Sequence, residues 1–223
     1  MIKNLANLFL KRGFMELFFA SGNEHKKKEM TKLFPSYTIR LPKEFGVDFD
    51  PIEDGTTFAA NSLIKAETLY KLVQKPVIAD DSGIEVDILN GRPGIYSARY
   101  AGKDDPFGLY QEKKLSSKER NALLIEEVID RIKDSQQPVT CRFVCAMTLY
   151  INKKTFLTVQ ETIEGQLITD ITKAQGQNGF GYDPIVFIPE YNKTMAELTE
   201  DEKNAISHRG KCAKKINLFL KNL

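Results

Sequence analysis

Short apolar runs alternate with helical patterns along most of this chain, and this alternation constrains its fold more than any other feature. Between Phe58 and Val73, apolar residues recur at the three- and four-residue spacing of an amphipathic helix. Val139–Tyr150 instead alternates residue by residue, the pattern of a long strand with one buried face. Strands mixed with long helices, without an internal repeat, predict an α/β fold with two lobes around a long sheet.

The same patterns place the other elements. Further strands are predicted at Glu16–Ala20, Tyr37–Leu41, Val77–Ala79, Ile84–Leu89 and Phe156–Glu164, the last as the antiparallel partner of Val139–Tyr150. A lysine-rich helix is expected after the first strand, and a final helix turns Cys212 and Ile216 inward. Capping boxes, in which a Ser or Thr is followed three residues later by Glu, predict helix starts at Ser116 and Thr199.

The composition excludes several classes of protein. The chain has 32 Lys and Arg against 30 Asp and Glu, and a net charge of +2 argues against a protein that coats nucleic acid or membranes through bulk charge. Three cysteines favour a reducing compartment over a disulfide framework. No apolar run approaches the roughly 20 residues that cross a bilayer. These features predict a globular, cytoplasmic protein without nucleic-acid or membrane partners.

Residues 1–14 are expected to be an extension that packs poorly, so that residues 15–223 form a single domain. The segment carries Lys3, Lys11 and Arg12 without an acidic partner. It lacks the long apolar stretch and the cleavage site of a secretory signal. Because chain termini are usually the least ordered part of a domain, deleting this segment is expected to change the Tm little.

Four polar segments interrupt the pattern, and two of them suggest phosphate and metal binding. Ser21–Lys26 follows a strand and opens a helix, where backbone N–H groups and the helix dipole attract anions. Asp80–Gly83 places two carboxylates that repel each other at a predicted strand end, and Glu53 is a further carboxylate that folding can bring near them. Mg²⁺ prefers such oxygen ligands. Each segment alone also fits an ordinary turn or a capped loop.

The other two segments lie late in the chain. Gly176–Pro184 leaves Phe180 little local cover, so the ring packs either on a planar ligand or in the core under a glycine-rich loop. Lys203–Lys211 holds one of the two histidines beside an arginine, between two predicted helices. A solvated basic junction is the ordinary alternative for this last segment.

Taken together, these segments resemble the Ham1-like inosine triphosphate pyrophosphatase family, which acts on noncanonical purine nucleoside triphosphates. The matching strings are Ala20–Asn23 with Lys26, Ala79–Gly83, Pro93–Gly102, Gly179–Pro184, Ala196–Thr199 and Lys203–Lys211. The resemblance extends from about Glu16 to the C-terminus. Two residues depart from the family pattern: Ser21 stands where threonine is common, and His25 where a small residue is common.

The resemblance implies Mg²⁺-dependent hydrolysis of ITP, dITP and XTP to the monophosphate and pyrophosphate, which clears these nucleotides from the pool. It also implies a long mixed sheet, two α/β lobes with the nucleotide in the cleft between them, and a homodimer. By position, Asp81 corresponds to the general base and a metal ligand, and Glu53 to a further metal ligand. The substrate-binding positions that it implies are Ser21, Gly22, Asn23, Glu24, His25, Lys26, Ser82, Phe180, Gly181, Tyr182, Asp183, Lys203, His208 and Arg209.

The chemistry of these residue types agrees with that activity. Splitting a triphosphate between its α and β phosphates needs charge neutralisation, an oriented water and a base. Mg²⁺ bound by carboxylates and phosphate oxygens would neutralise charge, and Lys26 with the loop N–H groups would extend this effect. Asp81, beside the metal, could accept the proton of the water. His208 and Arg209 can donate hydrogen bonds to the oxygen at purine position 6, where adenine carries an amino donor instead.

Two alternatives stay open. A Maf-like pyrophosphatase would act on pyrimidine nucleotides, and the His208–Arg209 string argues against it. A nucleotide-sensing or RNA-binding module would keep the pocket but lack turnover, and metal-dependent release of pyrophosphate would exclude it.

Overall fold

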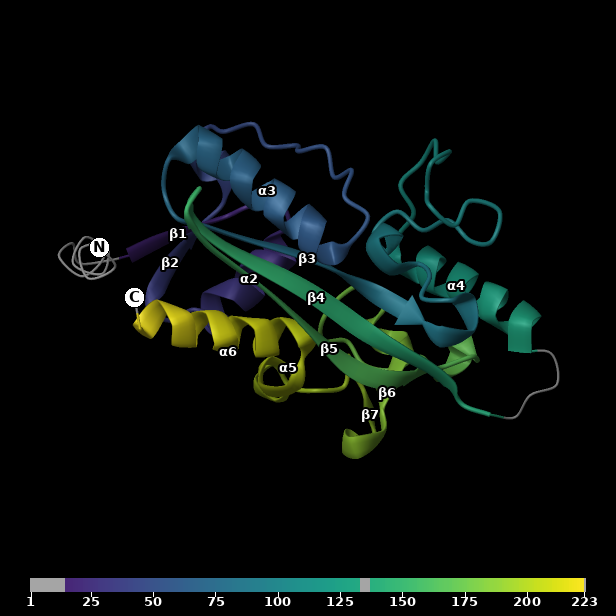
Figure 1. The fold of residues 1–223 in the computed structure, drawn as a ribbon. Helices are drawn as coiled ribbons and strands as arrows, with labels where there is room; N and C mark the ends of the chain where they lie inside the picture. Colours follow the sequence, from purple (N-terminus) through teal and green to yellow (C-terminus); the bar gives the residue numbers. More distant parts are fainter. Residues whose placement is uncertain (1–14, 133–136, 223) are drawn as a thin grey trace. The chain divides into compact units, whose positions relative to one another are not determined.

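The structure, a computed structural model, describes residues 15–132 and 137–222 (Figure 1). The predicted extension, residues 1–14, lies outside the described residues. Within the described part, seven strands form one sheet in the order β2-β1-β3-β4-β5-β6-β7, and the predicted α/β fold is confirmed. The strands are β1 (Met15–Phe19), β2 (Tyr37–Arg40), β3 (Val77–Val86), β4 (Val139–Asn152), β5 (Thr155–Leu167), β6 (Val186–Ile188) and β7 (Lys193–Thr194). The helices are α2 (Glu24–Leu33), α3 (Phe58–Val73), α4 (Ser117–Ile132), α5 (Glu200–Ile206) and α6 (His208–Lys221).

The sheet is mixed. β1 pairs in parallel with β2 on one side and with β3 on the other, and the chain makes these connections through α2 and α3. β5 and β6 are antiparallel, as are β6 and β7. β4 and β5 are neighbours in the sheet and are joined by the turn at Lys153 and Lys154, which forces them to run antiparallel. The predicted partner of the long strand is therefore confirmed.

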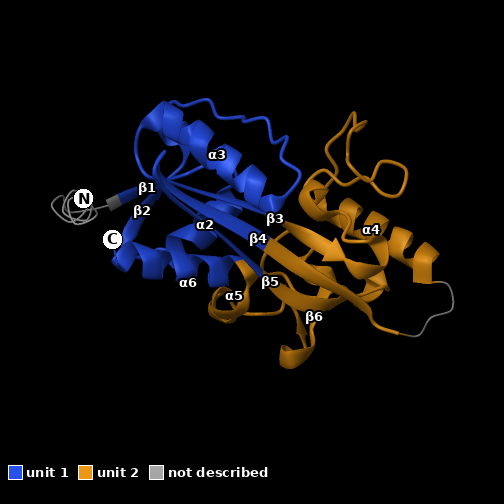
Figure 2. Cartoon of the chain, in the orientation of Figure 1, with its two compact units in different colours: residues 1–81, 145–161, 209–223 blue, residues 82–144, 162–208 orange. Residues whose placement is uncertain are grey.

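The chain divides into two compact units (Figure 2). Unit 1 comprises the described parts of residues 1–81, 145–161 and 209–223, and unit 2 comprises those of residues 82–144 and 162–208. β3, β4 and β5 each contribute one part to unit 1 and another to unit 2.

Unit 1 has helices on both faces of its part of the sheet (Figure 1). Successive side chains of a strand point to opposite faces, and those of β1 enter two different cores. Leu17 and Phe19 pack in one cluster with Ile216 of α6, and α2 contributes to the same cluster. Phe18 packs in another cluster with Leu69 of α3. Both faces of β1 are therefore buried.

β3 differs from the prediction in a way that matters for function. The sequence pattern placed a strand end and a polar turn at Asp80–Gly83, and this prediction is wrong because β3 is unbroken through these residues. Asp80 lies on the same face of β3 as Ile78, which packs in the cluster that contains residues of α2 and α6 (the α2–α6 core). Asp81 lies on the same face as Ala79, which packs in the cluster that contains residues of α3 (the α3 core). The two carboxylates point to opposite faces, so the repulsion expected between them is avoided.

β4 was predicted to be buried on one face only, and this is wrong for most of its length. The alternation of buried and more exposed residues holds only at the start of the strand, and every residue from Phe143 to Ile151 is buried. In unit 1, Met147 enters the α2–α6 core and Tyr150 enters the α3 core. Helices on both faces of the sheet therefore account for the continuous burial.

Both predicted capping boxes are confirmed. The backbone N–H of Ser116 donates to Glu119 at 2.7 Å, and the N–H of Glu119 donates to the Ser116 hydroxyl at 3.2 Å. The same reciprocal pair joins Thr199 and Glu202 at the start of α5. Each box satisfies two N–H groups that the first turn of a helix leaves without an intrahelical partner.

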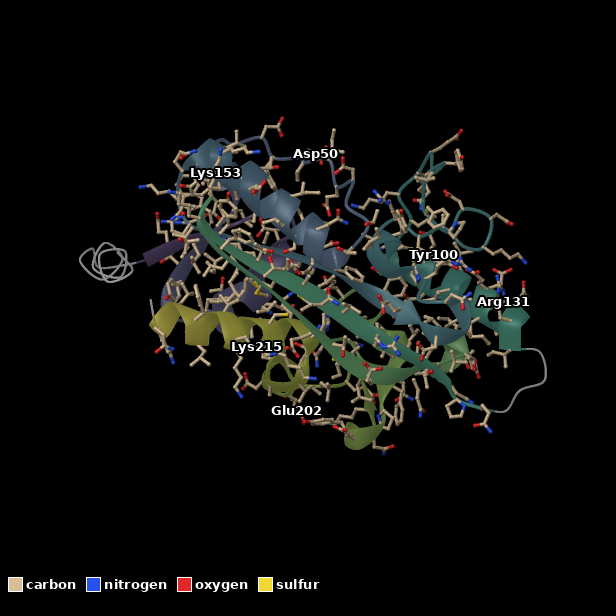
Figure 3. All side chains as sticks on the ribbon, viewed as in Figure 1. Asp50, Tyr100, Arg131, Lys153, Glu202 and Lys215 are labelled. Carbon is tan, nitrogen blue, oxygen red and sulfur yellow. The ribbon has the colours of Figure 1, made fainter. Side chains whose placement is uncertain are left out.

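Unit 2 buries α4 against the sheet. Leu124 and Val128 of α4 lie in one core with Phe143 of β4. The same helix carries a buried carboxylate, Glu127, which accepts a 2.7 Å hydrogen bond from the Tyr100 hydroxyl and a salt bridge from Arg92. Figure 3 shows Tyr100 beside α4. Burial, together with the Glu127 carboxylate, raises the pKa of Tyr100 well above its usual value.

The cysteines of the described residues, Cys141, Cys145 and Cys212, are free and buried in the core. Burial raises the pKa of the Cys141 thiol to about 12, so it is not a reactive thiolate at neutral pH. Among the described helices, none combines the length and the apolar character needed to cross a membrane.

Gly83 provides a test of this packing. A Cβ at this position would overlap the carbonyl oxygen of Gly94 and the hydroxyl of Ser97, which accepts a 2.9 Å hydrogen bond from the Ile84 N–H. We therefore expect Gly83→Ala to lower the free energy of unfolding by about 1–3 kcal/mol. Urea denaturation measures this loss. Gly22→Ala is the matched control, because no atom lies within 4 Å of a Cβ there; an equal loss in both variants would contradict the packing argument.

Candidate active site

The turn between β1 and α2 is built as a helix start. Asn23 is the N-cap of α2, and its side-chain oxygen accepts hydrogen bonds from the N–H groups of His25 at 2.9 Å and Lys26 at 3.2 Å. The Ser21 hydroxyl accepts from the Asn23 N–H at 3.1 Å. These bonds fix the predicted phosphate loop at the positive end of the helix dipole. Gly22, Glu24 and His25 are exposed, and Glu24 forms an ion pair with Lys43.

Asp80 of unit 1 is a buried carboxylate that pairs with two cations. Its Oδ1 and Oδ2 both lie 3.1 Å from Nζ of Lys26, and Oδ2 accepts from Nε and Nη2 of Arg209 at 3.1 and 2.9 Å. Asp80 is only 1% exposed. Burial raises the pKa of Asp80, but the charges of Lys26 and Arg209 outweigh that effect and hold the pKa well below its usual value.

Asp81 faces the other side of the sheet, toward α3. Its Oδ2 accepts from the side-chain amide of Asn61 at 3.2 Å, and its Oδ1 lies 3.1 Å from Nζ of Lys65. The same Lys65 nitrogen lies 2.9 Å from Oε2 of Glu53. Burial lowers the pKa of Lys65, and the charges of Asp81 and Glu53 outweigh it, so the net shift is upward. The two carboxylates predicted as metal ligands are thus held at one ammonium group.

The carboxylates of Glu53 and Asp81 suit a metal ion that is also bound by a substrate. No group of three or more His, Cys, Asp or Glu residues that could hold a metal is present among residues 15–132 and 137–222. Mg²⁺ is commonly bound by one or two carboxylates together with substrate phosphates, and Glu53 and Asp81 offer hard oxygen atoms within reach of one point. The two carboxylates therefore fit a Mg²⁺ ion whose remaining ligands are water and phosphate.

The glycine-rich loop of unit 2, Gly176–Pro184, is organised by Asp183. This buried carboxylate accepts a 2.7 Å hydrogen bond from the Phe180 N–H, and the same oxygen lies 2.8 Å from Nζ of Lys203. The Lys203 nitrogen lies 5.2 Å from the centre of the Phe180 ring, in range of a cation–π contact. The structure therefore brings Phe180, Asp183 and Lys203 together, and the Phe180 ring is half-buried.

Tyr182 and Gly181 connect this loop to the rest of unit 2 through hydrogen bonds. The Tyr182 side chain is 6% exposed, and its hydroxyl donates to the Ser97 carbonyl at 2.8 Å. The Gly181 carbonyl accepts from the side-chain amide of Asn121, on α4, at 3.2 Å. Tyr182 therefore belongs to the core of unit 2. Ser82, on β3, is half-buried and is the first residue of unit 2.

His208 and Arg209 lie at the start of α6 but belong to different units. His208 is 5% exposed and stacks on Phe143, with the ring centres 5.2 Å apart and the planes within 16°. Arg209 bonds Asp80 as described above, and its Nη1 lies 2.6 Å from Oε2 of Glu29 on α2. All three of its guanidinium nitrogens are thus engaged by carboxylates, and the predicted donation to a purine base stays a prediction.

Sequence reasoning missed Lys65, Asn61 and Glu29. The predicted apolar stripe of α3 did not include Asn61 and Lys65, yet both are buried there. One signal was available, since an Asn and a Lys one helical turn apart match the acceptors offered by Asp81 and Glu53. Glu29 carries no comparable signal, because it lies 180 residues from Arg209 in the sequence.

The buried pair in unit 2 yields a stability prediction. Asp183→Asn keeps the shape of the side chain but leaves the Lys203 ammonium without its charge partner, at a site where both side chains are less than 10% exposed. We expect the free energy of unfolding to fall by about 3–5 kcal/mol, measured by urea denaturation.

Asp130→Asn is the matched control for this change. Asp130 pairs with Lys103 on the same unit, but both side chains are about half exposed, and exposed pairs contribute little to stability. Equal losses in the two variants would show that burial of Asp183 is not what makes its pair important.

The chain is similar to known proteins over most of its length. The model of the Ham1 family matches residues 17–219. A dITP/XTP pyrophosphatase of Treponema denticola is 45% identical over 208 residues, which cover 93% of this chain and 99% of the relative. A dITP/XTP pyrophosphatase of Bacillus subtilis is 40% identical over 210 residues, which cover 92% and 96%.

Solved structures resemble the chain over a similar span. The Ham1 protein of Staphylococcus aureus is 35% identical with a TM-score of 0.74, and the match covers 93% of this chain and 98% of that one. A HAM1 protein from Coxiella burnetii is 34% identical with a TM-score of 0.77, covering 94% and 100%. With a family model that spans nearly all of its described residues and relatives that align over more than nine-tenths of its length, this chain belongs to the Ham1 family.

Proposed function

We propose that this protein is a nucleoside triphosphate pyrophosphatase that hydrolyses dITP, XTP and ITP to the monophosphate and pyrophosphate. The observation that carries the proposal is the placement of Asp81 and Glu53 at the single ammonium group of Lys65. The names of the relatives, dITP/XTP pyrophosphatases at 39–45% identity, support the same substrates. Removal of such nucleotides from the pool would be its role, and the cytoplasm its location.

The phosphate end of the substrate is assigned to unit 1. Lys26 supplies a positive charge at the start of α2, where the helix dipole also favours anions. Asp81 would accept the proton of the attacking water, since it is a carboxylate held in place by Asn61 and Lys65. Asp81 and Glu53 would hold Mg²⁺, which when bound neutralises charge on phosphate oxygens.

The base end is assigned to unit 2. The backbone N–H of Phe180 donates a hydrogen bond to Asp183, which fixes the backbone that carries the ring. The ring offers a face on which a purine can stack. Base–aromatic stacking of this kind is worth roughly 1–3 kcal/mol. Lys203 and Asp183 add a donor and an acceptor beside the ring, the groups that a purine edge can meet.

A homodimer is also part of the proposal, on the ground of the family resemblance alone. Sedimentation equilibrium measures this directly: a mass of twice 25.3 kDa is expected, and a single-chain mass would contradict it.

Pyrophosphate release tests the function. The purified protein would be assayed with ITP, XTP, dITP, GTP and ATP, with and without Mg²⁺, and the nucleotide product identified by chromatography. We expect monophosphate and pyrophosphate from the first three substrates, and much less from ATP and GTP. Binding without release of pyrophosphate from any substrate would instead indicate a nucleotide-sensing module.

Asp81→Asn tests the general base. The amide keeps the shape of the side chain but cannot accept the proton, and loss of a general base typically costs about 10²–10⁴-fold in rate. We expect kcat for ITP to fall by that amount while the circular dichroism spectrum is unchanged. A variant that retains nearly the parent rate would exclude Asp81 as the base.

Glu53→Gln tests the metal site. If Glu53 is a metal ligand, the Mg²⁺ concentration for half-maximal rate should rise by at least about tenfold, the loss seen for lesser changes around metal ligands. The neighbouring residue provides the control, Asp54→Asn, because Asp54 is exposed. An unchanged Mg²⁺ dependence in Glu53→Gln would remove Glu53 from the ligand set.

A further inference from the structure

The ion pairs of unit 1 show how Lys26 is held in this structure. Its Nζ lies 3.1 Å from both carboxylate oxygens of Asp80. The proposed function requires this same ammonium group to bind the triphosphate. Because two of the three N–H bonds of this ammonium group face Asp80, a triphosphate that takes more than one of them draws Lys26 at least partly away from this carboxylate.

Such a movement would ordinarily be unfavourable. The Asp80 side chain is completely buried, and a buried carboxylate without a cation is strongly destabilised. Arg209 is the second cation on this carboxylate, and it donates to Oδ2 from both Nε and Nη2. Because an arginine remains charged under all physiological conditions, Asp80 keeps a partner after Lys26 has moved.

Glu29 fixes the position of that second cation. Its Oε2 accepts from Nη1 of Arg209 at 2.6 Å, on the side of the guanidinium group away from Asp80's contacts with Nε and Nη2. The Arg209 side chain is 3% exposed, so it has little room to move. The planar guanidinium thus links α2, β3 and α6, the elements that carry Glu29, Asp80 and Arg209.

We propose that Arg209, held by Glu29, is a positioning residue. It compensates the buried negative charge of Asp80 and so allows Lys26 to bind the phosphates of the substrate. The inference rests on the proposed function only in assigning Lys26 to the triphosphate. It differs from the role that the family resemblance implies for Arg209, a contact with the substrate itself. In this assignment Arg209 acts through Asp80, and its effect is the same for any phosphate ligand, whatever base it carries.

Inorganic pyrophosphate distinguishes the two roles because it has no base. Its affinity would be measured by calorimetry, with Mg²⁺ present, for the parent and for Arg209→Met. If Arg209 positions Lys26, the variant should bind pyrophosphate about 10- to 100-fold more weakly, the usual effect of leaving a charged group unmet. For ITP, KM should rise while kcat changes little. Unchanged pyrophosphate affinity would overturn the inference.

A second substitution tests whether the effect passes through Asp80. Adding Asp80→Asn to Arg209→Met removes the buried charge that would otherwise retain Lys26, so the affinity for pyrophosphate should recover to within a few-fold of the parent value. If the double variant binds as weakly as Arg209→Met, then Asp80 is not the link and the inference is wrong.

Two further variants complete the test, one as a control for net charge and one as a replacement for Arg209→Met. Lys215→Met removes one positive charge from the same helix, α6, where Lys215 pairs with Glu161 at the surface, and it should leave pyrophosphate affinity unchanged. Equal weakening in Lys215→Met would reduce the effect to net charge and overturn the inference. If Arg209→Met does not fold, Glu29→Gln carries the test: it should weaken pyrophosphate binding in the same direction, and an unchanged affinity would contradict the proposal.

The outcome also separates this inference from the proposed reaction. Pyrophosphate affinities that follow the expected order, in a protein that hydrolyses no triphosphate, would support the positioning role and reject the reaction. Hydrolysis of ITP with pyrophosphate affinities that do not respond to Arg209 would do the reverse.

Discussion

The carboxylate of Asp80 is the constraint on which the arrangement of unit 1 depends. A charge this deeply buried is tolerated only when cations and hydrogen bonds compensate it. Lys26 comes from α2 and Arg209 from α6, so the ion pairs tie two helices to the same face of β3. The period of two along the strand then directs Asp81 to the opposite face, where α3 supplies Lys65. The adjacent acids Asp80 and Asp81 thus take part in separate groups of ion pairs, because they lie on opposite faces of the same strand.

Unit 2 uses a buried acid in a similar way. Asp183 holds both the Phe180 N–H and the Lys203 ammonium group, so one carboxylate orders a glycine-rich loop that has little packing of its own. The loop conformation also requires Gly179, whose φ is +84° and whose added Cβ would overlap the Asp183 carboxylate. The glycines are therefore needed for the close approach of this acid as well as for the turn itself.

Local features of this fold were predictable from the sequence. The bounds of α3 and both capping boxes depend on residues within one or two helical turns, and a pattern over that distance records them. The continuity of β3 through Asp80–Gly83 was not predictable in the same way. Two adjacent acids are typical of a turn unless distant cations compensate them, and Arg209 lies 129 residues away. The continuous burial of β4 likewise depends on helices that cover both faces of the sheet.

The residues of the candidate site divide in the same way, into those that the sequence indicated and those that depend on distant contacts. Glu53, Asp81 and Lys26 were singled out from the sequence, first by residue type and position and then by the resemblance to a family. Lys65 was missed because a lysine on the buried face of a helix looks like a surface residue until its acceptors are known. Buried ion pairs of this kind are poor sources of stability, and well-packed apolar residues often serve as well or better. An apolar residue in place of Asp80 would leave Lys26 and Arg209 without their common acceptor. The retained charges are therefore better explained by the proposed binding of the triphosphate than by folding: Asp80 holds the Lys26 ammonium group near the start of α2, and Arg209 supplies the second positive charge that Asp80 needs.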